Sequence, residues 1–209
     1  MKAISILDYG AGNLTSVRLA FERLGVEAAI CSSADEVLAS GAIVFPGVGS
    51  AASGMDAVRS RGFDRVLRQA VADQRPVLGI CLGMQLLFDF SAEDGGVPGI
   101  GLLPGEVKRF DFPADSGLKV PEMGWNGVSV AKPHPVFRNI PDGTPFYFVH
   151  SYYCVTGSAD DTAGITEYGG LNFTSAAARG TLVATQFHPE RSGSAGMQLL
   201  QNFVNWEGN

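Results

Sequence analysis

The chain has 209 residues, of which 45% are hydrophobic, and this supplies one sizeable core for a single domain spanning residues 1–209. The formal net charge of −6 gives no basic face for nucleic acid, and no apolar stretch approaches the length of a membrane span. Three widely spaced cysteines favour a reducing compartment over a disulfide framework. We therefore expect a cytoplasmic protein that has neither nucleic acid nor a membrane as a partner.

The first part of the chain alternates apolar strands with helices. The N-terminal apolar run is short and interrupted by Asp8, which predicts a first strand and not a signal peptide. The predicted elements in chain order are strand 3–8, helix 14–24, strand 26–31, helix 34–39, strand 42–45 and one long helix over about 53–73. This order, with strands that are apolar throughout, predicts a parallel sheet covered by helices on both faces.

After about residue 95 the pattern changes to short strands separated by turns rich in glycine and proline. Three of these strands are expected at 106–110, 127–131 and 146–154. A strand at 181–187 and a helix at about 194–206 close the chain. The predicted fold class is α/β, with an open, doubly wound, mostly parallel sheet that carries an antiparallel extension.

Cys81 stands where an apolar strand at 76–80 meets the start of a helix at 82–88. Gly79 and Gly83 flank it two residues away on either side, as in a thiol version of the G-x-S-x-G nucleophile elbow. A helix that begins beside the sulfur favours thiolate over thiol. Taken alone, a cysteine at the end of a buried strand is more often an ordinary core residue.

A base for that thiol is predicted at the far end of the chain. The strand at 181–187 leads directly into His188, Pro189 and Glu190. In an extended backbone the side chains on either side of the proline point to one side, so Glu190 can orient the His188 ring. By itself this triplet is more often a surface turn, but together with the Cys81 elbow it favours a Cys–His–Glu triad.

The turn at 46–49, with sequence P-G-V-G, follows another predicted strand at the edge where open α/β sheets bind ligands. Its backbone N–H groups, together with that of Leu82, would suit an oxyanion hole for a tetrahedral intermediate at Cys81. On its own the turn would be an ordinary connection between a strand and a helix.

The sequence predicts no cofactor and no metal. Gly10 and Gly12 follow the first strand, but Thr15 stands at the third position of a dinucleotide fingerprint and Cys31 stands where an acid would hold a ribose. The histidines are not at metal-ligand spacings with the cysteines; they are His134, His150 and His188.

Three motifs in this order carry a resemblance to a known family: P-G-V-G at 46–49, G-I-C-L-G-M-Q at 79–85 and F-H-P-E at 187–190. Together they resemble the class I (triad) glutamine amidotransferases. Four further runs resemble the subfamily of glutaminase subunits of imidazole glycerol phosphate synthases, from histidine biosynthesis. These runs are D-Y-G-A-G-N at 8–13, M-G-W-N at 123–126, H-S-Y-Y at 150–153 and T-E-Y-G at 166–169.

The resemblance implies a flavodoxin-like amidotransferase fold and a mechanism for hydrolysing glutamine. The Cys81 thiolate would attack the side-chain amide to give a thioester, ammonia would leave with a proton from His188, and water would release glutamate. The backbone of Val48 and Leu82 would form the oxyanion hole, switched on by a peptide flip. The residues implied to hold glutamine are Gly47, Gly49, Gln85, Ser151 and Tyr152.

The resemblance also implies a heterodimer with a (β/α)₈-barrel cyclase subunit that receives the ammonia and makes imidazole glycerol phosphate and an aminoimidazole carboxamide ribotide. Relatives usually carry His where this chain has Glu122, and often Lys where it has Arg191. We expect Glu122 to lie near the interface and to affect coupling to the partner and not the chemistry at Cys81. The predicted docking face comprises Asn13, Met123, Trp125, Tyr147 and Arg191.

Other functions remain open at this stage. The chain could supply ammonia to a different synthase, such as a sugar-aminating enzyme, or be a cysteine hydrolase of the related protease-like type. It could also be a non-catalytic binding module, since a fold does not fix a function. Retention of Cys81, His188 and Glu190 together argues against the binding module.

Overall fold

The computed structural model describes residues 3–10, 12–38 and 40–208. At its centre lies a parallel sheet in the order β2-β1-β3-β4-β13. Its strands are short and mostly apolar, as expected for strands that are covered on both faces. Their bounds are β1 (Ile4–Leu7), β2 (Ala28–Cys31), β3 (Ala42–Gly47), β4 (Val77–Cys81) and β13 (Leu182–Thr185).

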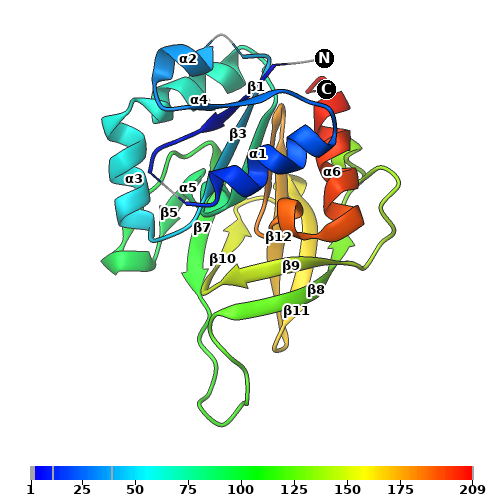
Figure 1. The fold of residues 1–209 in the computed structure, drawn as a ribbon. Helices are drawn as coiled ribbons and strands as arrows, with labels where there is room; N and C mark the ends of the chain where they lie inside the picture. The colour runs from blue at the N-terminus through cyan, green and yellow to red at the C-terminus, as the bar shows by residue number, and fades with distance from the viewer. Residues whose placement is uncertain (1–2, 11, 39, 209) are drawn as a thin grey trace.

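Helices cover both faces of this sheet, and strand alternation divides the core into two clusters. On β3, Val44 packs in one cluster with α1 and α6, whereas Ile43 and Phe45 pack in the other with α3 and α4. Figure 1 shows α1 and α6 side by side on one face of the sheet. The helices are α1 (Leu14–Arg23), α2 (Ala34–Leu38), α3 (Ala51–Ser60), α4 (Phe63–Ala72), α5 (Leu82–Leu86) and α6 (Gly193–Asn205).

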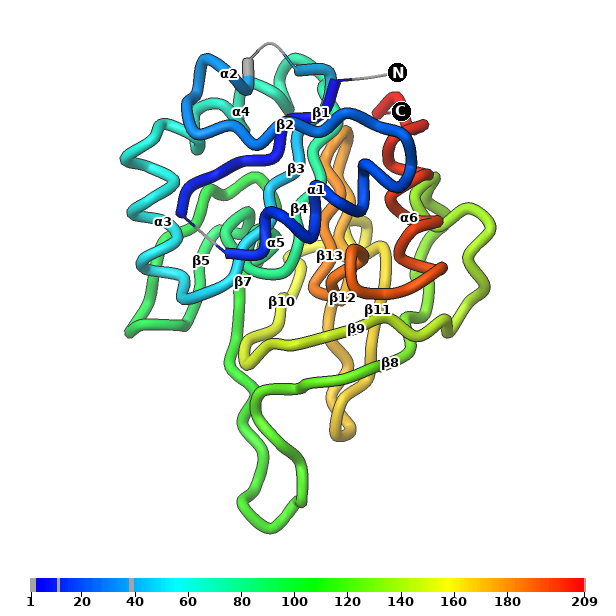
Figure 2. Tube along the Cα trace, viewed as in Figure 1, coloured from blue at the N-terminus to red at the C-terminus, as the bar shows by residue number. Residues whose placement is uncertain are grey.

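The remaining strands extend the sheet and are mostly antiparallel. The order continues from β13 through β12, β10, β7, β5 and β6, and β11, β8 and β9 branch from β12. Figure 2 shows β13 between β4 and β12, with β8 and β9 running across the lower part of the view. Their bounds are β5 (Phe88–Ser91), β6 (Val97–Pro98), β7 (Leu103–Arg109), β8 (Glu122–Val130), β9 (Thr144–His150), β10 (Tyr152–Thr156), β11 (Thr162–Tyr168) and β12 (Leu171–Arg179). The predicted fold class is confirmed.

Several predicted boundaries were wrong. The long helix expected over 53–73 is two helices, because Gly62 adopts a left-handed conformation (φ 71°) between α3 and α4. The helix after Cys81 has only five residues, and Phe88 already begins β5, which pairs with β7. The strand expected at 146–154 is divided at Ser151 into β9 and β10. Residue 39 of the predicted second helix and residue 11 of the D-Y-G-A-G-N run lie outside the described residues.

The register of the parallel strands brings the predicted motifs to one edge of the sheet. Gly47 at the end of β3 lies opposite Cys81 at the end of β4, and Ile80 lies opposite Thr185 of β13. The chain leaving β13 therefore carries His188 to the edge that holds the P-G-V-G turn and the cysteine. Within the described residues, no helix is long and apolar enough to cross a membrane.

Candidate active site

Cys81 sits in a strained turn between β4 and α5. Its backbone (φ 55°, ψ −112°) lies outside the regions that non-glycine residues normally occupy, at a typical cost of about 1–3 kcal/mol. The turn is tight because small neighbours allow close approach: a Cβ at Gly83 would lie 1.8 Å from the carbonyl oxygen of Phe45. A Cβ at Gly79 would lie 2.8 Å from Leu87 Cδ1. The glycine frame therefore permits the sharp elbow that presents the sulfur at the end of the sheet.

His188 and Glu190 meet as the sequence predicted. His188 Nδ1 lies 2.8 Å from Glu190 Oε1, and the side chains of both residues are buried. The same carboxylate oxygen accepts a second hydrogen bond, 2.8 Å long, from Asn13 Nδ2. Because a carboxylate is an acceptor, the proton of this pair belongs on His188 Nδ1. The other ring nitrogen, Nε2, is buried and has no hydrogen-bond partner among the described residues.

The surroundings of His188 favour its charged form. Burial by itself lowers the pKa of the ring, but the neighbouring Cys81 and Glu190 outweigh this effect and raise the pKa to about 10. The largest of the raising effects is the interaction of the ring with the Cys81 side chain, followed by its hydrogen bond with Glu190. The arrangement thus suits a His188 imidazolium beside Cys81.

A cavity of about 320 Å³ opens beside Cys81. Its polar lining includes two residues that the sequence reasoning did not assign to the site, Glu93 and His150. Gly47 is not part of the lining; it lies behind the cavity, where a Cβ would come within 1.9 Å of the Tyr9 hydroxyl. The predicted site residues that do line the cavity are Val48, Gly49, Cys81, Leu82, Gln85, Ser151 and Tyr152.

Gln85 is linked to the sulfur through a second glutamine. Its Nε2 donates to the carbonyl oxygen of Tyr152 (2.9 Å) and to Gln186 Oε1 (3.1 Å). Gln186 Nε2 in turn lies 3.8 Å from Cys81 Sγ. The amide nitrogen of Gln85 is therefore committed to the protein, which fixes the orientation of its side chain at the cavity wall.

Glu93, His150, Gln186 and Tyr9 are the polar neighbours of the site that sequence reasoning missed. Glu93 lies in a turn (Glu93–Gly95) and accepts a hydrogen bond from the backbone N–H of Ala51 at the start of α3. Burial raises the pKa of Glu93, and burial together with the nearby Cys81 raises that of the Tyr9 hydroxyl. His150 stands in the H-S-Y-Y run, which was the only signal that could have drawn attention to it.

The residues predicted for docking gather around the triad. The Trp125 and Tyr147 rings meet edge to face, with centroids 6.2 Å apart, and the Arg191 guanidinium lies 4.5 Å from the centroid of Tyr147. Trp125 and its neighbour Met123 are 58% and 65% exposed, unusually high for large apolar side chains. Asn13 touches the triad itself through Glu190.

The side chain of Glu122 points away from the exposed side chains of its neighbours on the strand. Its backbone belongs to the same strand as Met123 and Trp125, but its side chain points inward and is only 3% exposed. There it pairs with His150. Its backbone therefore lies on the strand that carries two of the predicted docking residues, whereas the carboxylate lies inside the protein, next to a residue of the cavity wall.

Comparison with known proteins agrees with this architecture. The profile of the family described as "Glutamine amidotransferase class-I" matches residues 5–206. A structure described as "Crystal structure of glutamine amidotransferase" has a TM-score of 0.74 at 19% identity, covering 99% of both chains. The structure of PurLQS from Thermotoga maritima has a TM-score of 0.75 at 19% identity, covering 98% of this chain and 99% of that chain. The fold is that of the class I glutamine amidotransferases.

Comparison by sequence finds relatives that are more similar to this chain than these two structures are. A protein from Dehalococcoides mccartyi is 46% identical over 96% of this chain and 95% of its own length. One from Moorella thermoacetica is 47% identical over 97% and 94%, and one from Pseudomonas aeruginosa is 47% identical over 100% and 99%. The first two are named "Imidazole glycerol phosphate synthase subunit HisH" and the third "Imidazole glycerol phosphate synthase subunit HisH 1". The chain therefore belongs to the class I glutamine amidotransferases and, within them, to the family of imidazole glycerol phosphate synthase HisH subunits.

Proposed function

We propose that this chain, a glutaminase subunit of histidine biosynthesis by its family membership, hydrolyses glutamine through a triad of Cys81, His188 and Glu190. One observation carries the assignment of the triad. His188 is bound through Nδ1 to a buried carboxylate, which leaves its buried Nε2 without another partner beside the strained cysteine elbow. This is the geometry of a nucleophile, a base and a group that orients the base.

The chemistry proceeds in two steps. The Cys81 thiolate attacks the amide carbon of glutamine, forming a C–S bond as the carbonyl electron pair moves to oxygen. When the tetrahedral intermediate collapses, the C–N bond breaks and the His188 imidazolium gives its proton to the leaving nitrogen, which departs as ammonia. Water, deprotonated by His188, then attacks the thioester carbon, and the C–S bond breaks to release glutamate and the thiolate.

The negative oxygen of each intermediate needs donors that are already in place. We assign this role to the backbone N–H groups of Val48 and Leu82, which both line the cavity with Cys81. The pairing of Gly47 with Cys81 across β3 and β4 supports the assignment, because it holds the P-G-V-G turn against the elbow. Gly49, with φ 113°, gives the turn the freedom to reorient a peptide when the site is switched on.

Glutamine itself presents an amide, an ammonium group and a carboxylate. We propose that Gly49, Gln85, Ser151 and Tyr152 hold it in the cavity and that Glu93, a carboxylate in the lining, pairs with its ammonium group. Gly47 then acts by leaving space behind the cavity and not by direct contact.

The ammonia must reach its acceptor without being lost to water. We propose that Asn13, Met123, Trp125, Tyr147 and Arg191 dock on a (β/α)₈-barrel cyclase subunit, giving a cytoplasmic heterodimer in which ammonia passes to the partner. The exposed Met123 and Trp125 support this docking, as does the name of the relatives, which describes them as synthase subunits. The 1–209 chain would then act as one amidotransferase domain.

The test is the release of glutamate from glutamine, measured for wild type and Cys81→Ala, alone and with the cyclase subunit and its ribotide ligand. Strong stimulation of the wild type by the liganded cyclase, and none in the variant, is the expected result. Cys81-dependent hydrolysis that ignores the cyclase would assign the chain to a different aminating synthase. No hydrolysis under any condition would overturn the glutaminase assignment for this chain.

A further inference from the structure

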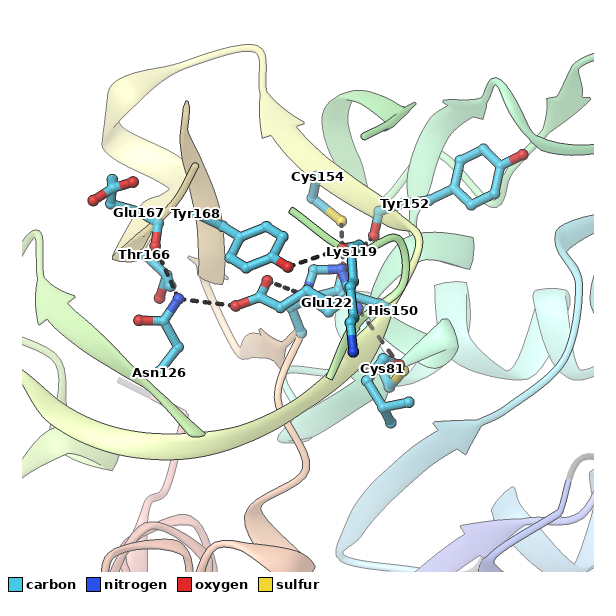
Figure 3. Close-up of polar contacts among 12 residues, drawn as sticks. Cys81, Lys119, Glu122, Asn126, His150, Tyr152, Cys154, Thr166, Glu167 and Tyr168 are labelled. Carbon is cyan, nitrogen blue, oxygen red and sulfur yellow. Dashed lines mark hydrogen bonds and ion pairs between the residues drawn. The ribbon is translucent and has the colours of Figure 1, made fainter. Parts of the chain in front are cut away.

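A second buried acid–histidine pair lies beside the cavity, separate from the triad. Glu122 on β8 stands directly opposite His150 on β9 in the antiparallel register. The two residues are 3% and 6% exposed, and His150 is part of the cavity wall. Figure 3 shows the Glu122 carboxylate between Asn126 and His150.

The hydrogen bonds around this pair determine where its protons lie. His150 Nδ1 is 2.7 Å from the carbonyl oxygen of Tyr152, which can only accept, so Nδ1 carries a hydrogen. On the other side of the pair, Asn126 Nδ2 donates to Glu122 Oε1 at 2.8 Å, which favours the ionised carboxylate. The remaining two atoms, His150 Nε2 and Glu122 Oε2, lie 3.1 Å apart.

This last contact requires a further proton. Neither His150 Nε2 nor Glu122 Oε2 has a hydrogen-bond partner among the described residues. The 3.1 Å separation is an ion-pair distance without the alignment of a hydrogen bond, so a neutral ring would leave the buried Glu122 carboxylate with no positive charge beside it. A hydrogen on Nε2 places that positive charge beside the carboxylate and gives a buried ion pair.

We infer that Glu122 holds His150 as an imidazolium at neutral pH and thereby acts as a positioning residue for glutamine binding. The second part of this inference rests on the proposed function, because it takes the cavity to be the glutamine site. Glu122 does not line the cavity, so it acts on it through His150.

His150 supports the part of the cavity wall where β9 ends and β10 begins. The carbonyl oxygen of Tyr152 accepts two hydrogen bonds, one from His150 Nδ1 and one from Gln85 Nε2. Ser151, between the two strands, and Tyr152 both line the cavity. A hydrogen bond from an imidazolium is about twice as strong as one from a neutral ring. The charge on His150 therefore keeps Tyr152, Gln85 and the Ser151 turn in one arrangement.

The variant that separates charge from shape is Glu122→Gln. Glutamine keeps the size of the side chain, accepts from Asn126 as before, and can donate its own amide hydrogen to His150 Nε2. The pair then stays satisfied with a neutral ring. The matched control is Glu167→Gln, which removes the same charge from an exposed residue of neighbouring β11.

The charge state is read directly by nitrogen NMR of the histidine rings in the full chain, which has only three histidines. We expect both ring nitrogens of His150 to carry hydrogen in the wild type at about pH 8, where an unperturbed histidine is neutral. In Glu122→Gln, only Nδ1 should carry hydrogen. A neutral His150 in the wild type at neutral pH would overturn the ion pair, whatever the variant does.

The positioning role is read from glutamine binding, by calorimetry in a Cys81→Ala background that cannot turn the substrate over. Glu122→Gln should weaken the glutamine Kd by about five- to tenfold, while Glu167→Gln leaves it unchanged. With Cys81 present, the KM for glutamine should rise more than kcat falls. An unchanged Kd in a Glu122→Gln variant whose His150 has become neutral would overturn the positioning role.

Failure of the proposed function would look different. In that case the wild type would show no Cys81-dependent glutaminase activity and the Cys81→Ala chain no glutamine binding, which would remove the glutamine site and the positioning role with it. The NMR measurement would still decide the ion pair, because it needs no substrate.

Discussion

Asn13 donates its hydrogen bond to the same oxygen of Glu190 that receives His188 Nδ1, at 2.8 Å in each case. One residue of the predicted docking face is therefore in direct contact with Glu190, the carboxylate that binds the ring of His188. Asn13 reaches this position in a left-handed conformation (φ 72°), at the residue before α1. Through this carboxylate, docking of a partner at Asn13 would act on the group proposed to orient His188.

Removing the Asn13 side chain should slow glutamine hydrolysis. Asn13→Gly keeps the left-handed backbone and deletes the donor, so Glu190 loses one of two charge-assisted hydrogen bonds. Such a bond contributes about 1.5–3 kcal/mol to stability, so we expect the free energy of unfolding to fall by up to about that amount, and kcat to fall by about tenfold or more as Glu190 loses its fixed position. Steady-state kinetics and thermal unfolding of the variant and wild type measure the two effects. An unchanged kcat would show that His188 alone keeps Glu190 in place.

The pH dependence of stability should carry the signature of His188. Its pKa is raised from the ordinary value of about 6.5 to about 10 by Cys81 and Glu190 against the effect of burial, so the folded state holds this proton more tightly. That contribution is complete below about pH 6.5, declines as pH rises and is lost above about pH 10. Chemical unfolding at about pH 6, 8 and 10 should show the decline in wild type and a flatter profile in His188→Gln.

His134 provides the control for this experiment. Burial, with a smaller contribution from Lys132, lowers its pKa to about 4, so its ring is neutral across the whole range tested. His134→Asn should therefore leave the slope above about pH 6 as it is in wild type. A slope in His188→Gln as steep as that of the wild type would contradict the assigned proton.

The elbow should not tolerate a methyl group at Gly83. Its Cβ would lie 1.8 Å from the Phe45 carbonyl oxygen, so the backbone of β3 or α5 must move. We expect Gly83→Ala to destabilise the fold by about 1–3 kcal/mol and to abolish hydrolysis. Gly157→Ala is the matched control, because its nearest neighbours lie at an ordinary 3.4 Å. Denaturant unfolding measures the stability of both variants. If Gly83→Ala were as stable as Gly157→Ala, the predicted clash at the elbow would be refuted.

Trp125 should matter for association and not for folding. The side chain is 58% exposed and contacts the predicted docking residue Tyr147, so truncation removes little buried area from the free chain. Trp125→Ala should weaken cyclase binding by about tenfold or more, as for aromatic anchors of interfaces, with an unchanged Tm. Ile30→Ala, on edge strand β2 far along the sheet order, should leave binding intact. Calorimetric titration of the cyclase with each variant measures this difference.

The order of the motifs was enough to predict that Cys81 and His188 reach the same edge of the sheet, because each follows a strand and parallel strands end at one edge. The break at Gly62 was not predicted, since apolar periodicity continues through Val58, Phe63 and Leu67 on both sides of it. Only the left-handed conformation of Gly62 separates the two helices. A glycine within a periodic run does not by itself predict whether a helix continues or ends there.

The inward side of β8 was also beyond sequence reasoning. A strand pattern shows that Glu122 and Met123 point to opposite faces, but not which face is buried, and a carboxylate is the less expected of the two inside. The partner that makes its burial tolerable, His150, stands 28 residues away and is brought opposite only by the register of β8 and β9. Contacts across the sheet, and not local patterns, define this part of the site.

Strands β8 and β9 form an antiparallel pair whose two faces carry different groups of residues. Trp125 and Tyr147 are paired on the outer side, and Glu122 and His150 are paired on the inner side at the end of the same ladder. Because His150 at the end of this ladder lines the cavity, a partner that bends or stiffens the two strands from outside would alter the cavity wall. Binding equilibria are reciprocal. If docking of the subunit changes the affinity for glutamine by some factor, bound glutamine changes the affinity for the subunit by the same factor.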